Sequence, residues 1–518
     1  MISEELKKAR EYEEQEEKNV PDSERPSYHF TARVGWLNDP NGFSYYGGKY
    51  HLFYQYHPYS TNWGPMHWGH AVSSDLITWK YLPAALAPDM DYDRSGCFSG
   101  SAVTMPNGKQ MLIYTGCSDD PSDEKGRWIQ QQCVAFGDGT DYEKYEDNPV
   151  ITVDDLPDGA GGHEFRDPYI WMSGSGRYRA IVANANHKNG GTTQMCLYKS
   201  DDGLHWRRES IVFEDSLKTG IMWECPNFFR IGSHYILMAC PMDMEAEEEE
   251  AEGSIRFPKG NNECYMTGLF DEYTGQFEPQ TSGDFNPLYY PVDLGLDFYA
   301  AQVLNAPDGR KIMIAWMQDP ENANKPHPDK KIYGQLTLPR ELYMKQGKLC
   351  QKPVKEIADH RGECKSYNNV IIDSEEKSIE GISGRVADIS IRLKPESITT
   401  DEEAHELPYD RFNMKFAADN KEVFTLFSYD PHRSTVTIDR TRSVPGRETT
   451  GRRTSKIRNR GGSIDLRILL DKWSAEIFIN DGEQVITTTL ETPIDAQDIL
   501  FSCSGKAVMN IAKYDLDI

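Results

Sequence analysis

Residues 50–57 read YHLFYQYH, a run of aromatic and apolar residues of the kind that forms a β-strand. Similar runs, each bounded by Gly, Asn or Asp, recur along the chain: SAVTM (101–105), QMLIYTG (110–116), YRAIVAN (178–184), HYILMAC (234–240) and KIMIAWM (311–317). No long amphipathic helix interrupts them. The pattern predicts an all-β fold, with one short surface helix within residues 3–19 that Pro21 ends.

A weak internal repeat divides these strands into groups. Each repeat carries a polar turn followed by an aromatic residue, and the aromatic residues lie 66, 61 and 71 positions apart: Trp79, Tyr145, Trp206 and Phe277. A unit of this length fits four strands and their connections, which is the size of one propeller blade. The repeat predicts a five-bladed β-propeller over residues 28–352, after an N-terminal helix and lead-in over 1–27.

The C-terminal part has a different strand pattern. Segments such as ADISIRL (387–393), STVTIDR (434–440) and SAEIFIND (474–481) alternate apolar and polar residues. Short strands of this kind, with turn signals about every ten residues, are typical of a β-sandwich. We therefore expect a linker over residues 353–371 and a β-sandwich domain over 372–518, to which we assign no chemistry.

The composition excludes several classes of function. The chain has 518 residues, and 56 Lys+Arg against 82 Asp+Glu give a formal charge of −26. This charge disfavours nucleic-acid partners and anionic membrane surfaces, which are held by basic patches. The sequence contains no apolar run of the roughly 20 residues that a membrane span needs. Without an apolar N-terminal segment or a CxxC pair among its ten Cys, we expect reduced thiols and a cytoplasmic location.

Two runs of charge stand apart from the strands. Residues 245–252 read EAEEEEAE, and we expect a solvated loop there. Residues 433–460 are rich in Arg, which suits a polar hairpin of the sandwich or a contact with an acidic partner subunit. Homo-oligomerisation stays open at this stage.

Three acidic residues share the same local pattern. Asp39, Asp167 and Glu224 each follow an aromatic residue by one to three positions, and Pro follows each within two. Pro fixes φ and donates no hydrogen bond, so it suits the edge of a sheet. Because the inner strands of propeller blades converge on one axis, acids from different blades can meet in a single funnel. Paired carboxylates of this kind are the machinery of glycoside hydrolysis.

The segments that carry these acids resemble the three signature motifs of glycoside hydrolase family 32: WLNDPNG (36–42), FRDP (165–168) and WECP (223–226). The resemblance continues through FYQYHP (53–58), NWG (62–64), WGH (68–70) and CFSGSA (97–102), and it covers essentially the whole chain. The first motif more often has Met where this chain has Leu37. The family includes invertases, fructan hydrolases and sucrose-6-phosphate hydrolases, and it pairs a five-bladed propeller with a β-sandwich.

The resemblance implies a role for each acid in a retaining mechanism. Asp39 would be the nucleophile, Glu224 the general acid and then the base, and Asp167 the transition-state stabiliser. The positions that match the family's fructose subsite are Asn38, Gln55, Trp63, Phe98, Ser99, Arg166, Asp297 and Trp316. The implied substrates are small: sucrose and short fructooligosaccharides, with sucrose 6-phosphate, inulin and levan as alternatives.

Other interpretations are weaker. His67 and His70 would point to opposite faces of a strand, so we expect no metal there, and no nucleotide fingerprint indicates a cofactor. Cys225 has no evident His partner that would make it a nucleophile. A sugar-binding propeller without catalysis would not need all three acids. An inverting pentosidase on a related propeller does not share the motifs around Asp39 and Glu224.

Overall fold

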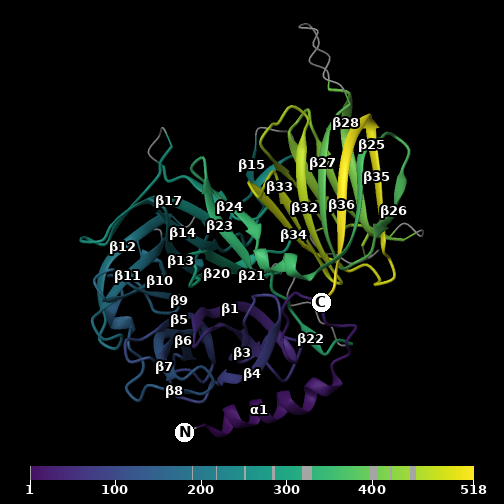
Figure 1. The fold of residues 1–518 in the computed structure, drawn as a ribbon. Coiled ribbons are helices and arrows are strands. Elements are labelled where there is room, and N and C mark those ends of the chain that lie inside the picture. Colours follow the sequence, from purple (N-terminus) through teal and green to yellow (C-terminus); the bar gives the residue numbers. More distant parts are fainter. Residues whose placement is uncertain are drawn as a thin grey trace.

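A computed structural model describes residues 2–188, 191–216, 219–249, 253–282, 286–317, 329–396, 407–419, 423–443 and 451–518. Figure 1 shows a ring of β-sheets with a second, all-β layer beside it and one helix along the outside of the ring. The chain is therefore a β-propeller followed by a β-sandwich, as the strand pattern predicts.

Five antiparallel sheets form the blades of the propeller. The first contains β1 (Gly35–Tyr46), β2 (Lys49–His57), β3 (His67–Ser73) and β4 (Trp79–Leu86), and the second contains β5 (Gly96–Thr104), β6 (Gln110–Asp119), β7 (Trp128–Gly137) and β8 (Tyr142–Lys144). The third contains β9 (Phe165–Met172), β10 (Tyr178–Asn186), β11 (Thr192–Ser200) and β12 (Arg207–Ser216). The fourth contains β13 (Trp223–Ile231), β14 (His234–Pro241), β17 (Cys264–Asp271), β18 (Gln276–Pro279) and β19 (Tyr289–Pro291). The fifth contains β20 (Tyr299–Asn305), β21 (Lys311–Trp316), β23 (Arg340–Lys345) and β24 (Lys348–Pro353).

The internal repeat marks the same place in four blades. The polar turns before Trp79, Tyr145, Trp206 and Phe277 connect the third and fourth strands of blades one to four. In the fifth blade this connection is the short turn Gln346-Gly347, which carries no such aromatic residue. The repeat therefore marks the same connection in four blades, and the fifth blade lacks its polar turn because only two residues join its last two strands.

The innermost strands close the ring around a central axis. β1, β5, β9, β13 and β20 contact one another in that order, and β20 returns to β1. The short strand β22 (Ile332–Tyr333) pairs with the start of β1 in parallel and joins the end of the propeller to its beginning. Side chains also cross each boundary, because a polar group of one inner strand bonds the backbone of the next.

Every innermost strand carries a β-bulge with one extra residue. The register shifts lie at Leu37–Pro40 in β1, Phe98–Gly100 in β5, Arg166–Tyr169 in β9, Glu224–Asn227 in β13 and Tyr299–Gln302 in β20. A bulge turns a side chain away from the regular alternation of a strand. Five bulges at one level of the ring therefore aim side chains at the axis.

The sandwich has two six-stranded sheets. One contains β25 (Arg361–Ile372), β36 (Ala507–Leu516), β27 (Ala387–Pro395), β32 (Ile464–Asp471), β33 (Ser474–Ile479) and β34 (Gln484–Thr489). The other contains β26 (Lys377–Ser383), β35 (Asp498–Gly505), β28 (Tyr409–Ala418), β29 (Thr425–Asp430), β30 (Thr435–Asp439) and β31 (Arg452–Lys456). Only a 3₁₀ segment, Lys355–His360, separates the first sheet from β24. Residues 361–371, which we expected to be linker, are strand because their backbone pairs with β36.

The N-terminal helix forms as predicted. α1 (Glu4–Glu16) begins after Ser3, whose hydroxyl accepts the amide of Leu6 at 3.1 Å. Leu6 and Ala9 are buried against the first blade, and α1 contacts β4 there (Figure 1). At 13 residues and with dense charge, α1 is not a membrane span, and no other helix among the described residues is long and apolar enough to be one.

The two charge runs meet where the propeller and the sandwich adjoin. The acidic run includes β15 (Glu247–Glu248), which pairs with β16 (Ile255–Phe257), and β16 contacts the basic strand β31. The Glu249 carboxylate accepts the backbone amide of Lys456 at 2.9 Å. The described part of the acidic run is therefore more than a solvated loop, because it contacts the sandwich. Residues 250–252 and 444–450 lie outside the described residues.

Candidate active site

The three predicted acids meet at the axis of the propeller. Asp39, Asp167 and Glu224 come from the bulges of β1, β9 and β13, and all three line one open cavity of about 510 Å³. Asp167 has a φ of 64°, and Cys225, next to Glu224, has a φ of 48°. Such angles are uncommon outside glycine and store strain that the surrounding structure holds in place. The local backbone is thus shaped to present these side chains.

Asp39 is held by two polar neighbours. Ser99 Oγ donates to its Oδ2 at 2.6 Å, and Asn38 Nδ2 donates to its Oδ1 at 3.0 Å. Burial raises the pKa of Asp39 to about 6, and the negative charge of Glu224 adds to the rise, while the Ser99 and Asn38 hydrogen bonds oppose it. Near neutral pH the carboxylate is therefore mostly ionised, as a nucleophile must be.

Asp167 is tied to the backbone of the next blade. The amide of Cys225 donates to its Oδ2 at 3.0 Å. Burial raises the pKa of Asp167 to about 7, with a further contribution from Glu224, while the Arg166 guanidinium pulls the pKa down. This bond fixes the Asp167 carboxylate in the cavity wall through Oδ2.

Glu224 is oriented from two sides. Arg166 donates to its Oε1 from Nε at 3.0 Å and from Nη2 at 2.9 Å. The Tyr299 hydroxyl donates to its Oε2 at 2.6 Å. Because one oxygen faces a cation and the other a neutral phenol, the carboxyl group has a fixed plane in which to exchange a proton with a ligand.

The thiol of Cys225 lies between two of the acids. Its Sγ is 3.7 Å from Asp39 Oδ2 and 3.7 Å from Asp167 Oδ2. A hydrogen bond with Cys240 and burial both raise the pKa of Cys225 well above that of a free thiol. Cys225 is therefore a protonated thiol beside the carboxylates, and not a nucleophile.

The outer wall of the cavity is aromatic. Trp63 and Trp128 stack with ring centroids 6.0 Å apart, and Phe98 meets the edge of both rings. Trp63 is 41% exposed, an unusual exposure for its size. Indole faces suit the C–H surfaces of a sugar, so this wall and the acids beneath it form a site for a carbohydrate ring.

Six of the eight predicted sugar-binding residues line this cavity, and two do not. Asn38, Gln55, Trp63, Phe98, Ser99 and Arg166 belong to its wall. Asp297 is fully buried, and its carboxylate is bound by Arg440 and Thr489 of the sandwich, so its predicted contact with fructose is wrong. Trp316 is 3% exposed and packs behind Trp36, which puts it outside the cavity wall.

Sequence reasoning missed other residues of the site. The cavity wall also contains Gly126, Arg127, Trp128, Gln130, His163 and Glu164, and Tyr299 contacts Glu224. His163 and Glu164 directly precede the FRDP segment, so their position was a usable signal. Trp128 is the first residue of β7, in a segment with no motif of its own. Among the described residues, no group of three His, Cys, Asp or Glu side chains has the geometry to hold a metal ion.

Comparison with known proteins gives a consistent result. The model of the glycosyl hydrolases family 32 N-terminal domain matches residues 29–353, and that of the family 32 C-terminal domain matches residues 356–515. A sucrose-6-phosphate hydrolase of Escherichia coli is 35% identical over 492 residues, and a raffinose invertase of the same species is 32% identical over 490, each alignment covering 93% of both chains. The solved structure of a Bombyx mori family 32 β-fructofuranosidase superposes with a TM-score of 0.80 at 28% identity, covering 99% of this chain and 98% of that one.

Proposed function

The chain belongs to glycoside hydrolase family 32 and is a β-fructofuranosidase, and on that premise we propose that it hydrolyses sucrose and short fructooligosaccharides from their fructose end with retention of configuration. The observation that carries the proposal is the convergence of Asp39, Asp167 and Glu224 in one cavity under an aromatic wall.

The proposed mechanism gives each acid one task. An Asp39 oxygen attacks the anomeric carbon of the fructosyl group while Glu224 gives its proton to the departing glycosidic oxygen. Glu224 then takes a proton from water, and this water attacks the same carbon and releases Asp39. Asp167 binds fructose hydroxyls, and its charge stabilises the oxocarbenium-like transition state. The two displacements together retain the anomeric configuration.

The charges of the cavity wall favour a neutral substrate. Among the described residues, three cationic or titratable nitrogen side chains line it, and each is bound to a carboxylate: Arg127 to Asp123 at 2.8 Å, His163 to Asp120 at 2.9 Å and Arg166 to Glu224 at 2.9 Å. A phosphorylated sugar needs a cation that is not already paired. We therefore place unphosphorylated sucrose ahead of sucrose 6-phosphate, although several similar proteins carry the name of a sucrose-6-phosphate hydrolase.

The size of the cavity suits an exo-acting enzyme, which removes terminal sugars, better than an enzyme that cleaves within a polymer. It is a pocket of about 510 Å³ lined by the acids, and a volume of this size holds a small ligand and not a polymer chain. Trp63 and Trp128 line the same cavity as the acids, and their rings offer a surface on which the leaving group can stack. Inulin and levan would enter only by their terminal fructose.

A reducing, cytoplasmic location is part of this proposal. All ten cysteines are free thiols and most are buried. Unpaired cysteines in such number suit a compartment that keeps thiols reduced. Fractionation of the source cells, with activity measured in each fraction, tests the location.

The deciding experiment is a matched panel of initial rates of fructose release from sucrose, kestose, sucrose 6-phosphate, inulin and levan. The Asp39→Asn variant, which keeps the shape of the side chain, serves as the blank. We expect sucrose or kestose to give the highest kcat/KM, and NMR of the first product to show the β-furanose form of fructose.

Each other outcome removes a part of the proposal. A clear preference for sucrose 6-phosphate replaces the neutral substrate with the phosphorylated one. An α-configured first product excludes the retaining mechanism. If the Asp39→Asn variant is as active as the unchanged enzyme, Asp39 is not the nucleophile.

A further inference from the structure

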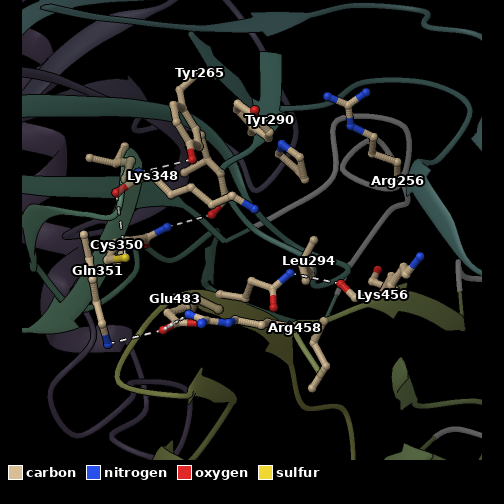
Figure 2. A pocket seen from close by; sticks show the side chains of 18 of the residues that line it. Arg256, Tyr265, Tyr290, Leu294, Lys348, Cys350, Gln351, Lys456, Arg458 and Glu483 are labelled. Carbon is tan, nitrogen blue, oxygen red and sulfur yellow. Dashed lines mark hydrogen bonds and ion pairs between the residues drawn. The ribbon is translucent and has the colours of Figure 1, made fainter. Parts of the chain in front are cut away.

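A second cavity lies between the propeller and the sandwich. Its volume is about 490 Å³, and it shares no residue with the cavity that holds the three acids. Figure 2 shows propeller strands on one side of it and sandwich strands on the other, with side chains of both pointing into the space between. Its walls come from β16, β17, β19 and the β23–β24 turn of the propeller, and from β31 and β34 of the sandwich.

The wall of this cavity has more positive than negative side chains, whereas the whole molecule has a negative net charge. Among the residues that the structure describes, two carboxylates line it, Glu249 and Glu483, against five cations: Arg256, Lys345, Lys348, Lys456 and Arg458. Outside the wall, Glu247 binds Arg256 at 2.6 Å and Asp481 lies 3.4 Å from Lys345. Counting these two carboxylates as well, the cations still exceed the acids, in a chain whose net charge is −26. A local positive excess in an acidic protein attracts small anions to that place.

Lys348 is the cation of this wall whose charge is least neutralised by nearby carboxylates. Its ammonium group lies 5.6 Å from the ring centroid of Tyr290, and within the described parts of the chain no carboxylate approaches it to 4.0 Å. A π face holds a cation without using its N–H groups. Lys348 therefore keeps its hydrogen-bond donors for a ligand.

Arg458 is only partly compensated. Its Nη1 donates to the Gln346 side-chain oxygen at 2.9 Å, and the nearest carboxylate, Glu483, is 3.7 Å away. Glu483 also pairs with Lys345 at 3.2 Å, so one carboxylate serves two cations. The guanidinium of Arg458 thus has donors left, and its fork geometry matches a phosphate group.

The remaining groups of the wall suit the hydroxyls of a sugar. The Tyr265 hydroxyl accepts the Leu349 amide at 3.2 Å and keeps its own proton to donate. Gln484 uses its amide nitrogen on Lys456 O at 3.0 Å, and the side chain lines the cavity. A volume of about 490 Å³ exceeds what a phosphate ion alone would fill, and it lies in the range of sites for small organic ligands.

We propose that this cavity between the domains is a binding site for a phosphorylated monosaccharide, with Lys348 and Arg458 holding the phosphate group. The cavity shares no residue with the one that cleaves fructosides, so a ligand bound in it is not a substrate of that reaction. Because its walls belong to two domains, a bound ligand joins them and stabilises the folded protein by mass action.

The test is isothermal titration calorimetry with glucose 6-phosphate, inorganic phosphate and glucose as three separate probes. The proteins are the unchanged enzyme, Lys348→Gln, Arg458→Gln and the double variant. Lys80→Gln is the matched control, because it removes one exposed charge from β4, and Lys80 belongs to the wall of neither cavity. Sucrose hydrolysis and the melting temperature of each variant check that the fold and the catalytic site are unchanged.

We expect glucose 6-phosphate to bind more tightly than either phosphate or glucose. Each single variant should weaken this binding about tenfold, since each loses charged hydrogen bonds to the phosphate, and the double variant should lose it. The Lys80→Gln variant should bind like the unchanged enzyme, and kcat for sucrose should be the same in all of them.

Three results would overturn the proposal. In the first, glucose 6-phosphate does not bind the unchanged enzyme. In the second, it binds the double variant as tightly, which would place it elsewhere, for example beside the three acids. In the third, glucose binds as tightly as its phosphate and Lys348→Gln has no effect, which would make the cavity a neutral-sugar site. None of these results bears on whether Asp39 and Glu224 cleave fructosides.

Discussion

At the scale of single residues, the protonation of Asp39 is the most sensitive property of the site. Burial and the Glu224 charge raise its pKa to about 6, and the Ser99 hydroxyl at 2.6 Å is the strongest opposing contact. A nucleophilic carboxylate works only when ionised, so activity should fall as the pH drops through this value. Asp167, whose pKa is about 7, must also be ionised and contributes to the same acidic limb. The Ser99 hydroxyl sets the part of that limb that belongs to Asp39.

We predict that Ser99→Ala moves the acidic limb of the kcat/KM profile to higher pH by about one to two pH units. A hydrogen bond to a charged group contributes about 1.5–3 kcal/mol, and 1.36 kcal/mol corresponds to one pKa unit. The direction follows because the bond favours the ionised form, so its loss raises the pKa of Asp39. The measurement is kcat/KM for sucrose between pH 4 and 8.

Ser44→Ala is the matched control, because Ser44 lies on the same strand as Asp39 and bonds only backbone and Gln110. Its profile should coincide with that of the unchanged enzyme. If Ser99→Ala lowered the rate equally at every pH, Ser99 would position the substrate without tuning Asp39.

The sequence predicted the residues whose surroundings are local. Asp39, Asp167 and Glu224 lie in motifs whose own backbone forms the bulge, so their direction is encoded within a few positions. The prediction for Asp297 was wrong because its partner, Arg440, lies 143 residues away in the other domain, and no local pattern reveals such a partner. Trp128 was missed for the converse reason, since the start of β7 carries no motif and the residue meets Trp63 only in the folded chain.

At the scale of elements, the five bulges are what turns a ring of strands into a site. They are joined by side chains that bond the backbone of the next inner strand. Asn41 Oδ1 accepts the Gly100 amide at 2.8 Å, Ser101 Oγ donates to Pro168 O at 2.7 Å, and Asn227 Nδ2 donates to Ala301 O at 2.7 Å. The position of each catalytic side chain thus depends on the neighbouring blade as well as on its own.

Gly100 lies where two neighbouring strands of the second blade leave no room for a side chain. It follows Ser99 in the β5 bulge, and a Cβ at this position would lie 2.0 Å from the carbonyl oxygen of Ile113. We predict that Gly100→Ala destabilises the protein by about 1–3 kcal/mol or more, since backbone must shift to admit the methyl group. The same shift moves Ser99 away from Asp39, so kcat should also fall.

Chemical denaturation and sucrose hydrolysis measure the two effects on the same preparation. Gly174→Ala is the control, because a Cβ there meets nothing within 4 Å and the glycine needs no positive φ. The argument from close approach is wrong if Gly100→Ala unfolds at the same denaturant concentration as the control.

At the scale of the whole molecule, the sandwich supplies the positive charge that pairs with a buried carboxylate of the propeller domain. Asp297, buried after the fourth blade, has its carboxylate bound by Arg440 and by the Thr489 amide at 2.7 Å, both from the sandwich. Removing one partner of a buried ion pair leaves the other charge without compensation, at a cost of about 3–5 kcal/mol. We predict this loss of stability for Arg440→Leu, measured by denaturation.

The double variant Arg440→Leu with Asp297→Leu tests the cause. Replacing both partners by apolar side chains of similar size is often neutral, so it should recover most of the stability that Arg440→Leu loses. If the double variant is no more stable than the single one, the ion pair is not what holds the two domains here.

A second contact between the domains depends on pH. His29, six residues before β1 of the propeller, is fully enclosed between Asp471 (Nδ1 to Oδ2, 2.9 Å) and Glu476 (Nε2 to Oε1, 2.7 Å) of the sandwich. Burial alone would lower the pKa of His29, but its hydrogen bonds to the two carboxylates outweigh burial and raise the pKa to about 9. The folded protein therefore keeps a proton that the unfolded chain loses near pH 6.5. By linkage, the stability that this contact contributes is fully present below pH 6.5 and is lost as the pH rises through 9.

We predict that the melting temperature of His29→Gln lies well below that of the unchanged protein at pH 6, and that the difference between the two melting temperatures narrows towards pH 9–10. His234→Gln, which alters a partly exposed histidine of β14, should show no such narrowing. A gap that stayed constant over this range would mean that His29 joins the domains as a neutral side chain.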